Sequence, residues 1–586
     1  MVKWARSGQR LLERRSAGPS LLAATLLWVN ACSPDNSTSP PPQDKRAVPS
    51  IPAPGYFPSE PPRNLGRQPL ISAGDESASP LRTNESGGFI VERSPDGDAR
   101  RGAQVAHAAC ILCHIFPEPD LINKDSWQKY VLPKMKLYLG VAQLDPEKNE
   151  GMQLLKASGL FPAAPMIPKK DWEDVVAYYL DTAPALATPQ APRAEIKIGL
   201  KHFVPVNPPA RRSPPLTTLT VIDSADQKIF TADATQQSLD VLDPIGRLVG
   251  SIPVGNIPVS LAKTERGLYL TTIGHFFPSE EKRGQLILLE STPQGFARKV
   301  LLSNLPRPTH LEFADFNGDG KPDFAMCMFG YLTGRFSWFE NLGNDEYREH
   351  ILFPKAGAIR SIVQDFNHDG SPDIAVLVGQ ETEGILMFYN DKKGGFTMRE
   401  LFRKPPSYGH SYFEAVDFNK DGLTDFLVTN GDNGDYTSPP KSYHGIRLYL
   451  NQGGDQLKEA FFYPLNGAYQ AVARDFDQDG DLDIAAISFF PDYEKSPRES
   501  FVYLENQGGL KFSASTFREC VAGRWLTMDA GDLDGDGDID IVLGSLIRMP
   551  TEVPPFVKDL WEKSSPSVLI LKNTLRDPGG TSSKSP

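Results

Sequence analysis

The sequence contains little cysteine, no surplus of positive charge and none of the usual motifs of hydrolases or nucleotide-binding enzymes. Five cysteines occur among 586 residues, and the formal net charge is −12, which argues against binding nucleic acid through a general basic field. Only one C-x-x-C pair is present, so a second pair that would complete a zinc site is missing. No Ser-His-Asp arrangement, H-E-x-x-H helix or phosphate-binding loop is apparent, and nothing marks a flavin site.

What the sequence does contain is a nine-residue acidic pattern, D-x-[D/N]-x-D-G-x-x-D, repeated five times. Oxygen atoms at positions 1, 3, 5 and 9, with a backbone carbonyl at position 7, can converge on one hard cation, and Gly at position 6 permits the sharp turn. Each copy runs directly into an apolar strand, so the pattern predicts one calcium site per strand connection. The predicted ligands are Asp315, Asn317, Asp319, Asp323, Asp365, Asn367, Asp369, Asp373, Asp417, Asn419, Asp421, Asp425, Asp475, Asp477, Asp479, Asp483, Asp532, Asp534, Asp536 and Asp540.

An acidic glycine turn can also join two strands without any ion. Five matched copies favour calcium over that alternative. The loop begins like an EF-hand, but an Asp at position 9 takes the place of the Glu at position 12, and no helix flanks it.

The acidic copies recur after 50, 52, 58 and 57 residues, a period typical of a propeller or solenoid. Between them, aromatic-aliphatic strands end in an asparagine, at Asn341, Asn390, Asn451 and Asn506. Several short strands and no long helix per period predict a four-stranded blade. Two earlier periods keep the strand pattern without the acids, so we expect seven blades over residues 215–576, with the strand at 568–573 closing the ring.

These repeats resemble the FG-GAP or VCBS repeat family, which includes the propeller of the integrin α chain. The resemblance is strong over residues 300–575 and weak over 215–300. It implies a calcium-binding propeller but no particular reaction. Cys327 and Cys520 fall in or near different blades, and we expect both to be unpaired.

A second candidate site follows from the expected blade geometry. Acidic loops between the first and second strands would share one face of the propeller, and the innermost strands would begin at the opposite face. Counting back five residues from the first Asp of each loop gives a possible ligand-binding ring of His310, Arg360, Tyr412, Gln470 and Thr527, with His410, Tyr469, Arg524 and Trp525 nearby. Solvated strand ends are the alternative interpretation.

The N-terminus predicts export. Basic residues precede a short apolar run at residues 21–29, too short to span a bilayer comfortably, which indicates a cleaved signal over residues 1–31. Val29-Asn-Ala-Cys32 resembles a bacterial lipobox, and the resemblance implies a lipid anchor on Cys32, with ordinary secretion as the alternative. Ser33 after that cysteine implies the periplasmic side of the outer membrane or the cell surface. Residues 32–96 are rich in Pro and Ser and predict a flexible tether.

The segment Cys110-Ile-Leu-Cys113-His114 is the C-x-x-C-H signature of covalent c-type haem attachment. Two thiols one turn apart form the thioethers, and the adjacent histidine is the proximal iron ligand. A redox dithiol would also begin with C-x-x-C, but the βαβ context of a thioredoxin-like unit is missing.

The surrounding residues 97–190 resemble a small cytochrome c domain of the kind fused to acidic-repeat propellers. Helices are expected at residues 98–109, 124–132 and 171–180, with Pro133 ending the second and the third packing on the first. The resemblance offers two distal iron ligands, Met135 and Met166, with core filling as the alternative role of either. Residues 191–214 are expected to be a linker and 577–586 a disordered tail.

The expected fold is therefore multidomain, a small all-α cytochrome c-like domain followed by an all-β seven-bladed propeller. The function that we expect is electron transfer by an exported, membrane-tethered protein that contains haem c and calcium and works with a redox partner protein or a small-molecule donor. One alternative is a propeller dehydrogenase that oxidises a sugar or alcohol and passes electrons to the haem. Another is an adhesion or interaction module with a haem sensor. A catalyst acting alone is less favoured, because no acid/base pair is apparent beside a second cofactor.

Overall fold

The computed structural model describes residues 90–143, 150–293, 295–434, 440–548, 551 and 553–576. The predicted signal over 1–31, the lipidated Cys32, most of the tether and the tail over 577–586 lie outside the described residues. No helix in the described part of the chain is long and apolar enough to cross a membrane.

The described residues between 90 and 190 form helices. The elements are α1 Ala99–Ala109, η2 Cys110–Leu112, η3 Pro119–Leu121, α2 Lys124–Ser126, η4 Trp127–Val131, α3 Leu132–Tyr138, α4 Glu150–Ser158 and α5 Lys169–Thr182. The first and last lie where the sequence predicts helices, whereas α4 was not predicted. Trp127, Trp172, Val176 and Tyr179 are the larger side chains of the core that these helices share.

Helix α1 packs on α5, as predicted, and Gly102 is the point of closest approach. A Cβ at Gly102 would lie 1.9 Å from the carbonyl oxygen of Asp174, so no larger residue fits this crossing. Asp98 caps α1 by accepting hydrogen bonds from the backbone N–H groups of Arg100 and Arg101. The backbone N–H of Asp98 in turn donates to Oδ1 of Asp174 at 2.8 Å, which ties the start of α1 to α5.

Pro133 does not end the second helix, contrary to the sequence-based expectation. The residues before it, η4, form a π-helical turn in which the N–H of Leu132 donates to the carbonyl of Trp127. Pro133 therefore falls in the first turn of α3, where a missing N–H removes no intrahelical hydrogen bond. The chain continues as helix to Tyr138 and places Met135 within α3.

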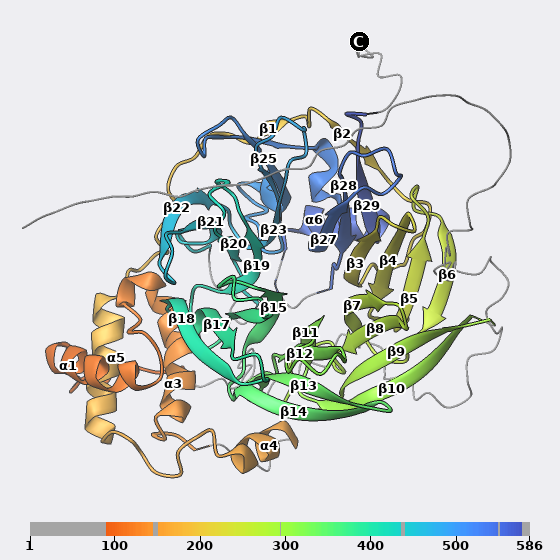
Figure 1. The fold of residues 1–586 in the computed structure, drawn as a ribbon. Coiled ribbons are helices and arrows are strands. Elements are labelled where there is room, and N and C mark those ends of the chain that lie inside the picture. The colour runs from red at the N-terminus through yellow and green to blue at the C-terminus, as the bar shows by residue number, and fades with distance from the viewer. Residues whose placement is uncertain are drawn as a thin grey trace, which may run out of the picture. The chain divides into compact units, whose positions relative to one another are not determined.

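Seven sheets follow, each with four strands or more, and they form a closed ring, which confirms the seven-bladed propeller (Figure 1). The first two sheets lack acidic loops. They comprise β3 Thr217–Asp223, β4 Lys228–Asp233, β5 Ser238–Leu242 and β6 Leu248–Pro253, then β7 Pro258–Thr264, β8 Gly267–Thr272, β9 Gly284–Thr292 and β10 Gly295–Leu305.

The next three sheets each carry an acidic loop between their first two strands. They comprise β11 Pro308–Ala314, β12 Asp323–Met328, β13 Arg335–Gly343 and β14 Glu346–Phe353; β15 Ala358–Gln364, β16 Asp373–Val378, β17 Glu383–Asn390 and β18 Phe396–Lys404; and β19 His410–Val416, β20 Asp425–Asn430, β21 Gly445–Asn451 and β22 Leu457–Pro464.

The last two sheets carry the fourth and fifth acidic loops. They comprise β23 Ala468–Arg474, β24 Asp483–Ser488, β25 Phe501–Asn506 and β26 Phe512–Thr516, then β27 Trp525–Gly531, β28 Asp540–Ser545 and β29 Val568–Asn573. The connections between these strands contain η5 Pro497–Ser500, η6 Arg518–Ala522 and α6 Pro555–Ser564.

The ring is closed by residues that the sequence assigned to the linker. Strand β2, Phe203–Val206, pairs antiparallel with β29 and is the outer strand of the seventh sheet, while β1, Lys197–Ile198, adds in parallel to β26. The propeller therefore begins before residue 215, and the strand at 568–573 is the third rather than the closing strand of its sheet. This arrangement satisfies the outer edge of β29, which would otherwise expose unpaired backbone groups.

The first strand of each sheet is innermost and contacts the first strands of its neighbours. The second strands are buried along their whole length in all five acidic sheets. Each sheet is covered on one face by the preceding sheet of the ring and on the other face by the following sheet. Phe336 of β13 and Phe388 of β17, for example, meet with ring centroids 5.5 Å apart across two sheets. Continuous apolar runs, rather than alternation, are what such doubly covered strands require.

Candidate functional site

All five acidic loops occupy the same position in their sheets, between the first and second strands. Each first Asp accepts a hydrogen bond from the backbone N–H of the Gly at position 6, at 2.8 to 3.1 Å. This Gly has a positive φ in every copy, between 81° and 98°, which explains why the turn needs glycine. The sequence pattern therefore fixes one loop shape, and it places all five loops on one face of the ring.

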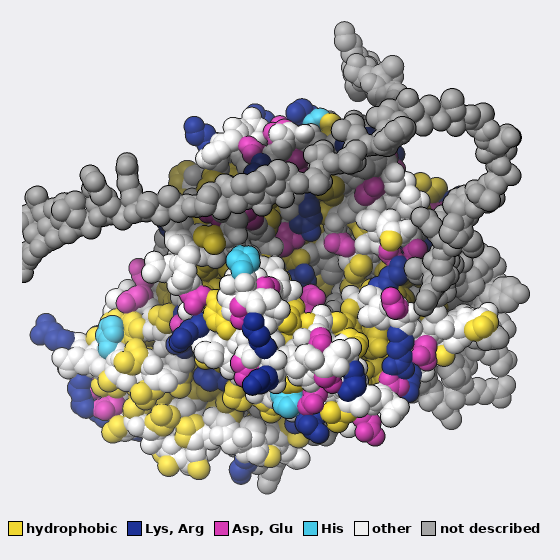
Figure 2. Space-filling model, viewed as in Figure 1, with side chains coloured by type: hydrophobic (Ala, Val, Ile, Leu, Met, Phe, Trp, Pro, Cys, Tyr) yellow, Lys and Arg dark blue, Asp and Glu magenta, His cyan; other side chains and the backbone are white. Residues whose placement is uncertain are grey.

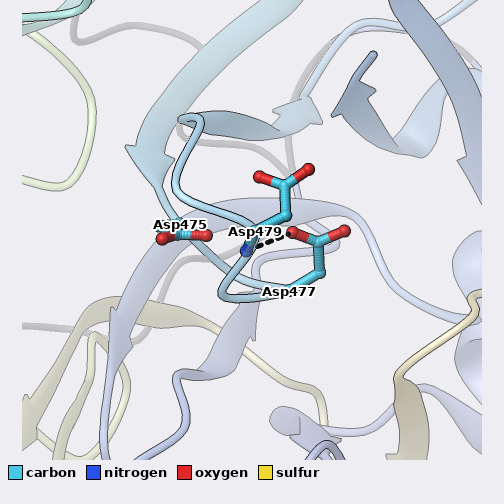
Figure 3. Close-up of side chains that lie close together, drawn as sticks. All are labelled: Asp475, Asp477 and Asp479. Atoms are coloured by element: carbon cyan, nitrogen blue, oxygen red, sulfur yellow. Dashed lines mark hydrogen bonds between the residues drawn. The ribbon is translucent and has the colours of Figure 1, made fainter. Parts of the chain in front are cut away.

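Three carboxylates converge in two of these loops. Oxygen atoms of Asp475, Asp477 and Asp479, and likewise of Asp532, Asp534 and Asp536, lie within 4.8 Å of one another. Figure 3 shows the first group on the turn that follows β23, with the N–H of Asp479 donating to Asp477. In the other three loops an asparagine stands at position 3, so two Asp side chains and an amide oxygen occupy the equivalent places.

The residues of these two loops fit a divalent cation. Asp475 Oδ1, Asp534 Oδ1 and Asp536 Oδ2 are buried and have no hydrogen-bond donor, and the same holds for Oδ1 of Asp538 at position 7 of the last loop. A buried carboxylate oxygen without a partner is costly, and a hard cation is the partner that oxygen-only ligands prefer. Neighbouring carboxylates so close together also repel one another unless a cation separates them.

The Asp at position 9 has a structural role that the sequence analysis missed. It is buried in every loop, and its Oδ1 accepts the backbone N–H of an asparagine at or near the end of the third strand, at 2.7 to 2.9 Å. The side-chain amide of that asparagine donates to the carbonyl at position 8. We call this pair of residues the Asp–Asn tie. The sequence signal for the Asp–Asn tie was that every acidic loop is followed by an apolar strand with an asparagine at or near its end.

Burial raises the pKa of the position-9 carboxyl groups, to about 6 at Asp483 and to about 7 at Asp540. The cause is the loss of solvation for the charged form, to which the neighbouring Asp side chains add repulsion. A bound cation would act in the opposite direction and favour the ionised carboxylate.

The C-x-x-C-H segment lies at the end of α1. Cys110 and Cys113 belong to one tight turn, in which the N–H of Cys113 approaches the carbonyl of Cys110 at 3.5 Å, and both thiols are free. The His114 ring places Nδ1 2.8 Å from the carbonyl oxygen of Ile115, so Nδ1 carries the proton and donates it. That hydrogen bond leaves Nε2 with its lone pair available for a metal.

The surface around this segment is unusually apolar. Ile111 and Leu112 are 57% and 66% exposed, and Ile115 beside His114 is also exposed. Cys110 packs against the helical core, and burial raises the pKa of its thiol to about 11. These residues fit a haem, because a covalently held porphyrin would cover the exposed apolar side chains.

The two candidate distal methionines differ in environment. Met135 in α3 is half-buried and packs against the same core cluster as Cys110. Met166 is 49% exposed, and its backbone N–H donates to the carbonyl of Leu139 at the end of α3.

The five residues of the predicted ligand ring, His310, Arg360, Tyr412, Gln470 and Thr527, come together around one cavity of about 690 Å³ inside the propeller. His410 and Tyr469 also line it. Arg524 and Trp525 do not, because both are buried in the packing of the last sheets. Arg524 donates to the carbonyl of Phe489, and Trp525 donates to the carbonyl of Cys520. Cys327 and Cys520 are buried and free, as expected.

Comparison with known families identifies the repeats. Residues 315–376, 365–428 and 417–486 match the family model described as FG-GAP-like repeat. The matched stretches overlap, and each begins at the first Asp of an acidic loop and extends into the next sheet.

Similar solved structures include BBS1N in complex with ARL6DN, with 10% identity, a TM-score of 0.36, and coverage of 63% of this chain and 93% of that chain. The Dos1 propeller gives 8% identity and a TM-score of 0.37, over 61% and 77% of the two chains. The N-terminal domain of Nup159 gives 10% identity and a TM-score of 0.36, over 66% and 99%. At these scores the likenesses carry no information on the function or partners of this chain.

Proposed function

We propose that this protein is an exported c-type cytochrome that transfers electrons, in which haem is attached at residues 110–114 and a calcium-binding propeller serves as the interaction module. The observation that carries the proposal is the His114 ring, whose Nδ1–H is held by a backbone carbonyl one residue after a C-x-x-C pair. A proximal iron ligand requires this arrangement, with Nε2 left free. When bound, the haem would supply a one-electron redox centre.

The environment of the cysteines supports haem attachment over a redox dithiol. Burial in the helical core raises the pKa of the Cys110 thiol to about 11, which makes Cys110 a poor attacking thiol for disulfide exchange. The exposed Ile111 and Leu112 have no role in a dithiol site, but they would be covered by a porphyrin attached beside them.

The distal ligand that we propose is Met135. Its position in the core shared with Cys110 suits a ligand held in place by packing, while about half of the Met166 side chain is exposed. A thioether ligand raises the reduction potential of the haem, which suits electron transfer.

Calcium completes the proposal. The uncoordinated carboxylate oxygens of the fourth and fifth loops support cation binding there, and the shared loop geometry extends the proposal to all five. Ions at these loops would hold together the first two strands of each blade and stiffen the ring. A lipid anchor at Cys32 would place the protein on the periplasmic side of the outer membrane or at the cell surface, near a redox partner protein or a small-molecule donor.

A second candidate function is an interaction module of which the haem is only a sensor. The FG-GAP-like match favours this candidate, because such repeats are suggestive of binding rather than catalysis. The two candidates differ in whether the haem exchanges electrons with a partner at a useful rate.

The test is expression of the full chain together with machinery for c-type haem attachment. We expect covalent haem that survives denaturing electrophoresis and a pyridine haemochrome spectrum typical of two thioether bonds. Cys110→Ala together with Cys113→Ala should abolish covalent attachment, whereas Cys327→Ala, a matched control in the propeller, should leave it unchanged. A colourless wild-type protein with an intact fold would overturn the proposal. Stopped-flow reduction by candidate donors then separates electron transfer from sensing.

A further inference from the structure

The central cavity of the propeller is a feature that the proposed function does not use. Its volume of about 690 Å³ falls in the range of small-molecule sites, and its walls come from the innermost strands and the loops that follow the second strands. Figure 2, viewed as in Figure 1, shows charged side chains of both signs around the hollow at the centre of the ring. The strands that line the cavity belong to one closed ring of sheets, so their pairing fixes that part of the walls.

Arg360 is the cation placed for a ligand. Its guanidinium stacks over the Tyr412 ring, with Cζ 4.6 Å from the ring centroid, and its Nη1 donates to Nε2 of His310 at 3.2 Å. Burial lowers the pKa of His310 well below its ordinary range, so this ring is neutral and accepts that hydrogen bond. Stacking and the histidine together fix the plane of the guanidinium.

The opposite edge of Arg360 has no partner within the described part of the chain. Nε is buried and makes no hydrogen bond, Nη2 makes none, and no carboxylate of the described residues lies within 4 Å of the guanidinium. The Nε–Nη2 edge is one of the two edges through which arginine binds a carboxylate with two parallel hydrogen bonds. Nε has almost no accessible surface, so a ligand in the cavity reaches this edge through Nη2, the donor that is neither paired nor buried.

The acidic residues of the cavity limit the charge of the ligand. Asp529 is already engaged, because its two oxygens accept the backbone N–H groups of Ile222 and Ala530 at 2.7 and 3.0 Å. Glu312 lies near His310, with 3.8 Å between Oε1 and Nε2, and Asp432 lines the cavity as well. A second negative charge on the ligand would face these carboxyl groups and be repelled.

Part of the remaining wall is aromatic, and part is polar, with Thr218, Thr220 and Ser260. Phe276, Phe329 and Phe490 line the cavity with partly exposed rings, and Gln470 exchanges two hydrogen bonds with the backbone of Met528, so its amide is not available to a ligand. The aromatic part of the wall fits the apolar body of a molecule whose polar end reaches Arg360.

We propose that the propeller cavity binds a small organic monocarboxylate with an apolar body, held through its carboxylate by Nη2 of Arg360. The site is independent of the haem and of the calcium loops. The acidic neighbours disfavour dicarboxylates and phosphate. Arg307 also lines the cavity, but its Nη1 and Nη2 already donate to the carbonyls of His275 and Phe276, so Arg360 is expected to determine the affinity.

The test is calorimetric titration of the full chain with benzoate, a monocarboxylate with an aromatic body. Benzamide, which has the same shape without the charge, phthalate, with a second carboxylate, and inorganic phosphate are the comparison ligands. The variants are Arg360→Gln and Arg360→Lys, the second keeping the charge but losing the planar guanidinium that Tyr412 and His310 hold in place. Arg399→Gln, on the exposed outer strand β18, is the matched control. Thermal unfolding of each variant establishes that it is folded.

We expect saturable benzoate binding to the wild type and the Arg399→Gln variant, with affinity reduced by about tenfold or more in both Arg360 variants. Benzamide, phthalate and phosphate should bind at least about tenfold more weakly than benzoate. The proposal is overturned if folded wild-type protein fails to bind benzoate, if benzamide binds equally well, if phthalate or phosphate binds more tightly, or if folded Arg360→Lys protein keeps full affinity. A colourless protein that still binds benzoate would overturn the proposed function and leave this site intact.

Discussion

The backbone N–H of Asn390, at the end of β17, donates a 2.9 Å hydrogen bond to Oδ1 of Asp373, the last residue of an acidic loop. The other oxygen of Asp373 accepts the N–H of Phe366 at 3.1 Å. One buried carboxylate thus joins the loop, the second strand and the third strand of its blade. The same relationship between the ninth loop residue and a terminal asparagine recurs in all five acidic sheets.

Removing this carboxylate should destabilise the propeller. Asp373→Ala leaves two buried N–H groups without an acceptor, and we expect the free energy of unfolding to fall by about 2–4 kcal/mol. Chemical denaturation followed by tryptophan fluorescence measures the change. The control is Asp559→Ala on the exposed face of α6, which should change stability by less than about 1 kcal/mol. Equal stability of the two variants would show that the Asp–Asn tie contributes nothing.

Calcium should stabilise the propeller by mass action. At calcium about 100-fold above the dissociation constant, each occupied loop should contribute about 2–3 kcal/mol to the free energy of unfolding. Thermal unfolding with calcium and with a chelator measures the effect, and magnesium is the comparison ion. The double variant Asp534→Asn, Asp536→Asn should lower the bound calcium by one ion per chain. Asp226→Asn, in the first blade, which lacks the nine-residue acidic pattern, should not change the bound calcium. An unfolding temperature that is insensitive to chelator would contradict calcium binding.

An ion-pair cluster on the outside of the ring should make stability depend on acid pH. Asp345 contacts Arg266 and Lys299, and these cations hold the pKa of its carboxyl well below the ordinary value. Because the folded-state pKa is depressed, the stabilisation is present above the unfolded pKa of about 4 and is lost as the pH falls through the folded-state pKa.

The variant Asp345→Asn tests this dependence, since asparagine also tolerates the positive φ of 63° at this position. We expect the wild type to exceed the variant in stability by about 1–2 kcal/mol at pH 6 and the difference to shrink toward pH 2. Urea denaturation at a series of pH values measures it. A difference that stays constant from pH 6 to pH 2 would exclude an ionic contribution.

The distal ligand can be assigned by spectroscopy of the haem-loaded protein. Met135→Ala should abolish the methionine–iron charge-transfer band and lower the reduction potential, because a thioether ligand stabilises the ferrous state. Met166→Ala should retain the band, since this side chain is about half exposed and does not belong to the core shared with Cys110. Retention of the band in both variants would exclude both residues, and its loss only in Met166→Ala would reverse the assignment.

The blade repeat could be predicted from sequence because its signals are local. Loop residues such as Asp417 and Gly422 sit at fixed spacings, and the strand that follows is continuously apolar, so the number and positions of the blades followed directly. The ring residue Arg360 was placed correctly by counting back from a loop, since the first strands of all blades have the same length.

Other features depend on contacts between distant residues. Phe203 gives no strand signal beyond a short apolar stretch in a proline-rich segment, and only its pairing with Asn573 reveals it as part of the propeller. Trp525 was expected near the cavity, but its indole N–H finds a buried carbonyl at Cys520 and turns the side chain into the core. Pro133 was expected to end a helix because proline disrupts a regular α-helix. The π-helical turn before it, which lets the helix continue, leaves no recognisable pattern in the sequence.

The pairing of β2 with β29 has a consequence for how the molecule is assembled. The propeller's earliest and latest segments share one sheet, so β2 leaves the ribosome long before its partner exists and must wait, unpaired, until nearly the whole chain has emerged. A fragment that stops short of residue 568 would therefore leave an open ring with two unsatisfied edges, a species prone to association with other chains.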